Sequence, residues 1–357
     1  MSLQPVTQQS GRMRGALLGL GAAALFGASA PVSKLLLGQT APQMLAALLY
    51  LGAGAGLLLV RGRRRSQQEA PLRSEDWPYL AGIVITGGMI GPVLMLHGLR
   101  QVSGVAGSLL LNLEAPFTIA VAVLFFGEHL ARREATAAAI IILGGATLTM
   151  ERDAPSQATV VGVLLLAGAC AAWAVDNNLT QKLSLKDPFS LVRIKTLSAG
   201  TVNLLIALAL GQQLPSIRII AAAAIVGFVS YGVSILLDAY ALRDLGAARE
   251  AAFFSTAPFF GAALSIPLLG ETLTVARVVA VALMSAGVVL LLRARHGHTH
   301  EHVALDHEHR HVHDEHHQHE HLPTDPPGEP HSHPHRHAPL AHEHPHVSDV
   351  HHRHGHG

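Results

Sequence analysis

The chain has 357 residues and a formal net charge of +1 at pH 7; half of its residues are hydrophobic and 14% are charged. Its mean hydropathy is +0.36. This profile is typical of a membrane protein and excludes an ordinary soluble domain, and no nucleic-acid partner is expected.

Ten apolar stretches follow one another along the chain, each about 17 to 25 residues long, the length that crosses the hydrocarbon core as a helix. The first stretch follows Arg12 and Arg14 and is too long for a signal peptide, so we expect it to be a transmembrane helix. The sequence therefore predicts an all-α membrane protein with ten transmembrane helices, at about 14–37, 42–60, 78–99, 105–126, 134–150, 159–181, 189–210, 217–240, 247–269 and 273–292.

Lysine and arginine are distributed unequally over the two sides of this arrangement. With the N-terminus inside, 17 of these residues, Lys195 among them, fall on the inner side. Four fall on the outer side: Arg100, Arg152, Arg218 and Arg277. Because cytoplasmic loops are enriched in Lys and Arg, we expect a multi-pass protein of the inner (plasma) membrane with both termini in the cytoplasm.

The two halves of the chain are similar in sequence. The segment GLRQVSGVAGSLLLNLEAPFTIAVAVLFFGEHLARREATAAAIIILGGATL aligns with ALRDLGAAREAAFFSTAPFFGAALSIPLLGETLTVARVVAVALMSAGVVLL with a one-residue gap. The matched pairs are Arg100 with Arg243, Pro116 with Pro258, Gly127-Glu128 with Gly270-Glu271, and Gly144 with Gly287; Lys34 matches Lys182 more loosely. Each repeat holds five helices, an odd number, so the second repeat must enter the membrane from the opposite side.

These features resemble the EamA type of the drug/metabolite transporter superfamily. Each half ends with a proline-containing helix, a Gly-Glu turn and a glycine-bearing last helix, and the resemblance covers residues 14–150 and 159–292. It implies a ten-helix inner-membrane carrier, usually an exporter of amino acids, metabolites or drugs, that works by alternating access around a central cavity.

Glu114 stands near the start of a long apolar run, where a charge is costly and is expected to face the bundle interior and to have a use. Pro116 leaves the carbonyl of Asn112 without its usual helix donor. We therefore expect Asn112 and Glu114 to cluster on a locally opened backbone and to bind substrate or ions. The alternative is that Glu114 only joins helices.

A second polar cluster lies in the predicted helix 159–181. Asp176, Asn177 and Asn178 are consecutive and span about 300° of a helix, so this helix is expected to be central. Trp173 and Asn177 form an i, i+4 pair that offers a stacking surface beside an amide. We expect Trp173, Asp176 and Asn177 to bind substrate or ions; hydrogen bonding between helices is the alternative.

Three further polar groups lie near the ends of predicted helices. Lys34 either extends toward the outer surface or neutralises Glu114 or a substrate carboxylate. His97 is either an interfacial histidine or a proton relay near Glu114. Asp238 is expected to pair with Arg243 at the surface. Lys34 and His97 are therefore included among the candidate substrate-binding and ion-binding residues.

The sequence contains no recognisable enzyme signature. It has no phosphate-binding GxxxxGK[ST] and no nucleophile flanked by a base, and Cys170 is its single cysteine. We therefore expect a protein that is not an enzyme, with no catalytic residues, and expect Cys170 to pack between helices.

The last 62 residues, 296–357, hold 23 of the 25 histidines. Proline and low hydrophobicity predict a disordered cytoplasmic tail. Closely spaced imidazoles bind divalent metals, so the tail is expected to bind Zn, Ni or Co while transport itself needs no cofactor. The predicted metal-binding residues are His298, His300, His302, His307, His309, His311 and His313.

Two functions are compatible with these features. The first is an exporter of a small organic metabolite or drug, with the tail as an accessory; the second is a divalent metal transporter or a metal-responsive membrane protein. The family resemblance favours the first function and the tail favours the second. The expected partners are a small-molecule substrate, the lipid bilayer and divalent metal ions; homodimer formation stays open.

Overall fold

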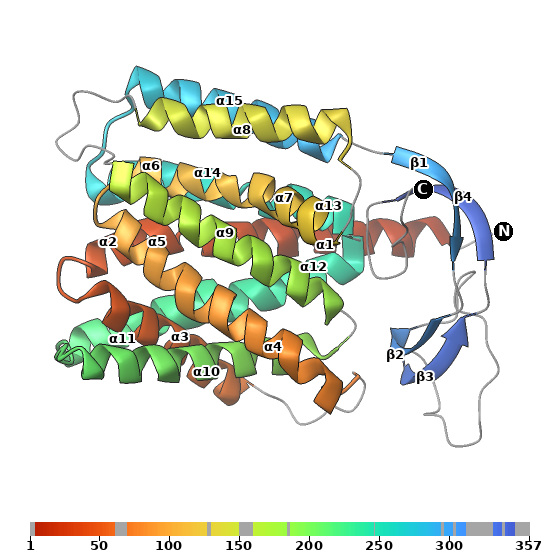
Figure 1. The fold of residues 1–357 in the computed structure, drawn as a ribbon, viewed down its shortest axis with the longest axis horizontal. Coiled ribbons are helices and arrows are strands. Elements are labelled where there is room, and N and C mark those ends of the chain that lie inside the picture. Colours follow the sequence, from red (N-terminus) through yellow and green to blue (C-terminus); the bar gives the residue numbers. More distant parts are fainter. Residues whose placement is uncertain are drawn as a thin grey trace.

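The computed structural model describes most of the chain and shows a bundle of long helices (Figure 1). Backbone alone is described for 4–12, 126, 242–244, 247–249 and four strands in the tail. The described residues are 4–60, 70–126, 130–149, 160–183, 186–245, 247–293, 296–302, 305–311, 331–337 and 340–346.

The first half is helical throughout its described residues, apart from short turns. Its elements are α1 (Gln4–Gly27), α2 (Ser29–Leu36), α3 (Pro42–Val60), the 3-10 helix η2 (Ser74–Asp76), α4 (Trp77–Ile83), the π-helix η3 (Val84–Ile90), α5 (Gly91–Leu99), α6 (Gly104–Leu110), the 3-10 helix η4 (Leu111–Leu113), α7 (Glu114–Phe126) and α8 (Arg132–Leu148).

The second half repeats this order. Its elements are α9 (Val160–Lys182), α10 (Pro188–Ala209), α11 (Ile217–Gly227), the π-helix η5 (Phe228–Val233), α12 (Ser234–Leu245), α13 (Ala247–Phe254), α14 (Ala257–Leu269) and α15 (Val275–Leu292).

Nine helical stretches within the described residues are long and apolar enough to cross a membrane. The predicted span 134–150 is α8, which has 17 residues, at the short end of what crosses a bilayer. It packs along the whole of α15, the last of the nine stretches (Figure 1). The structure thus confirms the all-α membrane fold, and α8 accounts for the tenth predicted helix.

The packing of the spans follows the repeat. With the spans numbered one to ten in chain order, spans 2 and 7 pack together (α3 and α10), as do spans 4 and 9 (α6 and α14) and spans 5 and 10 (α8 and α15). The repeat makes span 1 equivalent to span 6, span 2 to span 7 and span 3 to span 8. The contact of span 1 with span 8 is accordingly matched by a contact of span 6 with span 3. The contact of span 2 with span 8 is matched in the same way by a contact of span 7 with span 3. This pattern is that of a pseudo-two-fold axis relating the two five-helix repeats.

Small residues allow some of these helices to approach closely. A Cβ atom at Gly227 in α11 would overlap the backbone carbonyl of Leu49 in α3. The backbones of spans 2 and 8 therefore touch at this point, and no larger residue fits there without displacing one helix.

The regular helix is interrupted at related places in both halves. The π-helix η3 in span 3 corresponds to η5 in span 8 within one residue of the repeat alignment. Span 4 changes to a 3-10 helix at η4 before Pro116, and span 9 is broken between α13 and α14 before Pro258. Because π-helical turns and helix breaks recur at functional sites, these positions locate the candidate site.

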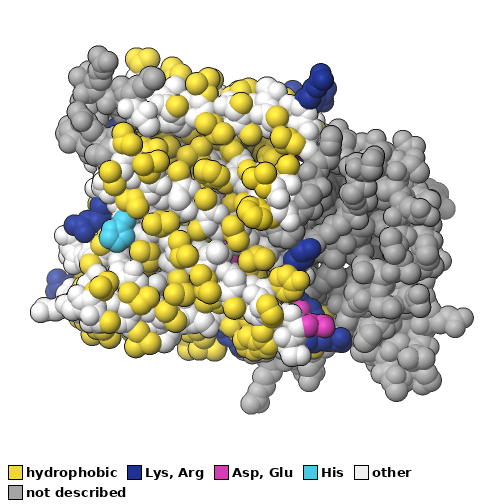
Figure 2. Space-filling view, viewed as in Figure 1, with side chains coloured by type: hydrophobic (Ala, Val, Ile, Leu, Met, Phe, Trp, Pro, Cys, Tyr) yellow, Lys and Arg dark blue, Asp and Glu magenta, His cyan; other side chains and the backbone are white. Residues whose placement is uncertain are grey.

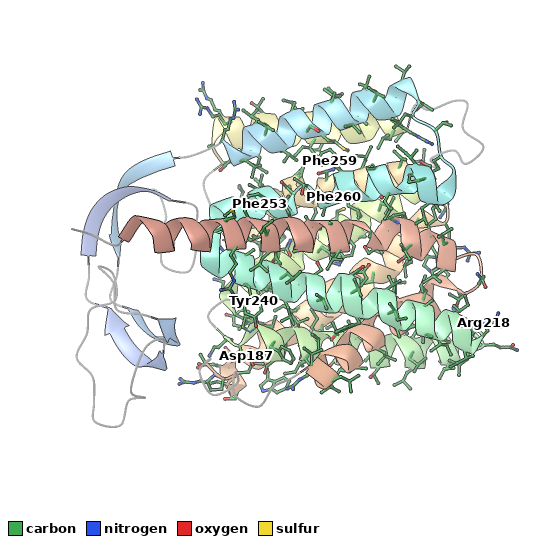
Figure 3. The ribbon with its side chains drawn as sticks, turned by 180° about the vertical axis from the view of Figure 1, so that it is seen from behind. Asp187, Arg218, Tyr240, Phe253, Phe259 and Phe260 are labelled. Carbon is green, nitrogen blue, oxygen red and sulfur yellow. The ribbon has the colours of Figure 1, made fainter. Side chains whose placement is uncertain are left out.

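The outer surface of the bundle suits a lipid environment. Figure 2 shows mainly hydrophobic side chains across one face, with Lys and Arg gathered toward the two ends of the bundle. In Figure 3, Arg218 extends from one end, and Asp187 and Tyr240 lie toward the other. Charges at the ends and apolar groups between them are the arrangement expected of membrane-spanning helices.

Four strands are described in the tail: β1 (His296–His302), β2 (Leu305–His311), β3 (His331–His337) and β4 (Leu340–His346). Strand β1 pairs antiparallel with β4, and β2 with β3. The segment predicted to be disordered therefore includes paired backbone at these residues. The side chains of the seven predicted metal-binding histidines, and all of His313, lie outside the described residues.

Candidate functional site

The break in span 4 places Glu114 at the first position of α7. Immediately before it, the thiol of Cys170 in α9 approaches the carbonyl oxygens of Leu110 and Leu111, at 3.6 Å and 3.8 Å. This buried sulfur is a weak donor to the carbonyls at the break, in addition to packing between helices as predicted. The locally opened backbone that Pro116 predicted is present.

Glu114 is held by an amide from the neighbouring helix. The Nδ2 atom of Asn177 in α9 donates to Oε1 of Glu114 at 2.6 Å. Asn177 is exposed although it lies within a membrane span. Trp173, one turn earlier on the same face, contacts η3, so this face of α9 lies between η3 and α7. Asn177 is therefore exposed beside η3 and α7, and Glu114 is partly exposed.

A buried ion pair lies beside this carboxyl group. Nζ of Lys195 in α10 is 2.5 Å from Oδ2 of Asp176, and both side chains are largely buried. The hydroxyl of Thr180 donates to the other carboxylate oxygen at 3.5 Å. Thr180, one turn later on α9, thus supports the carboxylate of Asp176, and Lys195 supplies the counter-charge.

The placement of Lys195 corrects the sequence interpretation. It was counted with the cytoplasmic loop cations, but it lies two turns inside α10 and faces the bundle. Its position inside the predicted helix 189–210 was a usable signal, because intramembrane charges are rare and usually paired. The pairing with Asp176 could not be deduced, since it depends on how α9 and α10 pack.

The π-helix η3 lies beside the ion pair, and its backbone carbonyls accept hydrogen bonds from side chains of three other spans. The carbonyl of Gly87 accepts from the hydroxyl of Tyr50 at 2.8 Å and from Nε1 of Trp173 at 3.2 Å. A side chain at Gly87 would overlap the carboxylate of Asp176. The next carbonyl, that of Gly88, accepts from Asn203 at 3.2 Å. Side chains from spans 2, 6 and 7 thus satisfy the carbonyls that the wider π-turn leaves available.

Aromatic rings extend from this point toward the second half. Tyr50 and Tyr231 have ring centroids 5.5 Å apart, and Tyr231 and Phe26 make an edge contact at 5.8 Å. Phe254 lies 5.2 Å from Phe26. In Figure 3, Phe253 and Phe260 lie beside α1, next to this row. Sequence reasoning missed Tyr50 and Tyr231, since isolated tyrosines in apolar helices carry no distinguishing pattern.

Asn112 does not join Glu114. It is buried, and its Nδ2 atom donates to the carbonyl of Leu109 at 3.0 Å and approaches the sulfur of Met284 in α15 at 3.8 Å. The amide of Asn112 therefore connects span 4 to span 10 and makes no hydrogen bond to Glu114 among the described contacts.

Lys34 and His97 also lie apart from Glu114. Nζ of Lys34 donates to the carbonyls of Leu99 and Val102, at 2.7 Å and 2.5 Å, in the turn between spans 3 and 4. His97 is exposed near the end of α5. Lys34 therefore holds a connecting turn and does not neutralise Glu114.

The same turn is held from the second half. The carboxylate of Glu271, in the second Gly-Glu pair, accepts from the backbone N–H groups of Gly104 and Val105, at 2.5 Å and 2.9 Å. Arg277 lies 3.7 Å from this carboxylate. A residue of one repeat thus caps a helix of the other, which ties the two halves together at this end.

Asp238 lies in α12, which packs against α13, the helix that holds Glu250. The side chain of Arg243, the predicted partner, lies outside the described residues.

The fold and the buried charges define a multi-pass membrane carrier built from an inverted repeat, with a polar site at the breaks in its central helices. The chain belongs to the EamA-like transporter family, whose model matches residues 13–150 and 160–293. It is 30% identical over 283 residues to an uncharacterised transporter of Methanothermobacter thermautotrophicus, covering 74% of this chain and 82% of that protein. A solved crystal structure of an 18% identical protein covers 80% of this chain and 98% of that chain with a TM-score of 0.55.

Proposed function

We propose that this membrane transporter is a secondary carrier of the inner membrane that exports a small organic metabolite or drug by alternating access. The observation that carries the proposal is the hydrogen bond between Glu114 and the exposed Asn177, beside the buried Asp176–Lys195 ion pair. Helix breaks and π-turns surround these groups, and carriers place substrate and ion sites at such points.

The proposed orientation has both termini in the cytoplasm. It is supported by the excess of Lys and Arg in the loops on the side of the N-terminus. The export direction is supported by the family resemblance.

The His-rich tail is proposed to bind Zn, Ni or Co as an accessory to transport. The strand register supports this proposal, because it sets histidine opposite histidine, for example His298 opposite His344 and His309 opposite His333. Cross-strand residues lie close enough for two or more imidazoles to share one ion.

A metal ion as the transported substrate is less compatible with the site. The ammonium group of Lys195 already neutralises Asp176, so a divalent cation at Glu114 would leave these groups with a net positive charge. The described site therefore favours an organic substrate, and the tail remains the proposed metal-binding segment.

Substitution of Glu114 tests the proposed site. Glu114→Gln keeps the shape and the hydrogen bond to Asn177 but removes the charge, so export should fall by about 100-fold while membrane insertion is kept. The measurement is growth of an overexpressing strain on a panel of toxic amino acids, drugs and metals, followed by efflux of the solute that scores. Glu75→Gln, at an exposed carboxylate, is the matched control. Unchanged efflux by Glu114→Gln across a pH series would assign Glu114 a structural role only.

Truncation tests the tail. Removing 296–357 should abolish most Zn, Ni or Co binding by the purified protein and leave organic-solute efflux measurable, because the segment lacks any apolar span. Metal titration of both forms is the measurement. Intact metal stoichiometry after truncation would place the metal site among the helices.

A further inference from the structure

Histidine occupies every second position over most of each tail strand. Strand β1 reads HGHTHEH, β2 reads LDHEHRH, β3 reads HSHPHRH and β4 reads LAHEHPH. A period of two places alternate residues on one face of a strand, whereas a helix would distribute them around its axis. The histidines of each strand therefore share a single face.

The backbone pairing sets these histidines opposite one another. The His–His pairs are His296–His346, His298–His344 and His300–His342 in the β1–β4 ladder, and His307–His335, His309–His333 and His311–His331 in the β2–β3 ladder. Two residues, 303 and 304, separate β1 from β2, and two, 338 and 339, separate β3 from β4. The two ladders therefore keep one register, which is that of a single antiparallel hairpin.

The paired segments lack the apolar surface that stabilises most hairpins. Leu305 and Leu340 are the only large apolar residues in the four described strands. Pro334 and Pro345 have no N–H to donate to a ladder. Because an isolated two-stranded hairpin is marginally stable at best in water, a further interaction is needed to hold these strands together.

We propose that divalent metal ions bind between the paired histidines and close the His-rich tail into this hairpin. The inference rests on the metal binding proposed above for the tail, and it adds the ligand pairs and the change of shape that binding causes. A metal that binds the folded arrangement and not the extended chain contributes its binding energy to folding.

The spacing of the pairs suits a tetrahedral ion. Zn²⁺ takes four ligands and accepts imidazole nitrogens. Cross-strand partners lie about 5 Å apart at their Cβ atoms, and the next pair on the same face lies about 7 Å further along the strands. One His–His pair can therefore supply two ligands and the neighbouring pair two more. Each ladder contains enough pairs for at least one ion.

Closure of the hairpin would change the position of the distal tail. Strand β1 begins at His296, four residues after α15 ends at Leu292, and its partner β4 ends at His346. Metal binding therefore brings residue 346 back to the end of span 10. The metal-free tail, which the sequence predicts to be disordered, would extend away from the bundle.

Chelation within one strand is the competing arrangement. Histidines two positions apart share a face and lie about 7 Å apart at their Cβ atoms, so one ion can be bound without any contact between strands. Such binding would leave the two sides of the hairpin separate. Distances between the strands distinguish the two arrangements.

The test measures two distances in the full-length protein by electron paramagnetic resonance. Cys170→Ala removes the single native thiol, and pairs of spin-labelled cysteines are introduced in that background. The partner pair is Thr299→Cys with Glu343→Cys, which the register sets opposite each other. The control pair is Thr299→Cys with Ser332→Cys, because Ser332 lies opposite Arg310 in the other ladder. All histidines are kept, and Zn²⁺ is diamagnetic.

Zinc is expected to reverse the order of the two distances. In a flexible chain the partner pair should be about 36 Å apart and the control pair about 32 Å, because the average distance grows with the square root of the sequence separation. With Zn²⁺ the partner pair should shorten to about 5 Å between Cβ atoms, while the control pair stays near ~30 Å because Ser332 lies further along the hairpin. Removal of Zn²⁺ with EDTA should restore the first order.

Substitution of the ligands tests the register itself. His342→Ser with His344→Ser removes two ligands of the β1–β4 ladder and should raise the Zn²⁺ concentration that closes the partner pair by about tenfold or more. His351→Ser with His352→Ser, which removes two histidines outside the paired strands, is the matched control. Equal shifts for the two variants would overturn the assigned ligand pairs.

A partner pair that stays further apart than the control pair while Zn²⁺ binds would overturn the closure and leave the metal binding of the tail intact. A partner pair that is already close in EDTA and does not change with Zn²⁺ would also overturn it, because the strands would then pair without metal. If titration of the same samples shows no Zn²⁺ bound to the tail, the metal binding proposed above fails, and the closure fails with it.

Discussion

The two halves of the molecule share one backbone plan but differ in chemistry. Both contain a π-turn in their third span and a break before a proline in their fourth. In the first half the break before Pro116 carries Glu114, and η3 lies against Asp176 and Trp173 of α9; in the second half η5 carries Tyr231, which packs against Phe26 and Tyr50. The comparison indicates that the repeat provides the framework, and that the charges of the proposed site, which come from both halves, gather at the interrupted helices of the first half.

The largest effect is expected from removing the counter-charge of Asp176. Lys195→Met leaves Asp176 buried without its cation and should destabilise the protein by about 3–5 kcal/mol. Thermal unfolding in detergent is the measurement. The double variant Lys195→Met, Asp176→Asn should recover most of this loss. Equal instability of the single and double variants would show that Lys195 acts through packing alone.

A smaller loss of stability and efflux is expected from an alanine substitution in η3 than from the change at Lys195, and the same substitution in η5 should have less effect. Gly87→Ala in η3 places a methyl group on the carboxylate of Asp176 and should cost about 1–3 kcal/mol and reduce efflux. Gly232→Ala in η5 is the matched variant, because its Cβ would lie 3.3 Å from a Phe228 ring atom that can shift. Unfolding and efflux are compared for both variants. Equal losses at the two positions would contradict the assignment of the site to the π-turn η3.

The smallest effect concerns the hydrogen bonds to η3. Tyr50→Phe removes one of two donors to the carbonyl of Gly87 and leaves Trp173 in place, so the loss should be about 0.5–1.5 kcal/mol. Tyr79→Phe, at an exposed tyrosine, is the control. Thermal unfolding again measures the difference. A null result would mean that Trp173 alone satisfies the carbonyl.

Some site residues could be predicted because a polar side chain within an apolar helix is energetically costly whatever the helix packs against. Glu114, Asp176 and Asn177 are polar within apolar helices, and their hydrogen bonds confirm that they face protein groups. Asn112 met the same criterion, but its amide contacts Leu109 and Met284 instead. Lys195, Tyr50 and Gly87 were missed, because their roles depend on contacts with other spans.

The sequence by itself determined the membrane class, the apolar spans, the repeat and the family, because hydropathy, helix length and self-similarity are properties of consecutive residues. Tertiary structure alone decided which charge pairs with which. Lys195 meets Asp176 because α10 packs on η3 and η3 on α9. Lys34 is directed to the carbonyls of Leu99 and Val102 by the turn beside it. In a low-dielectric bundle such pairings depend on distances of a few ångströms between helices, and the spacing of residues along one chain does not specify them.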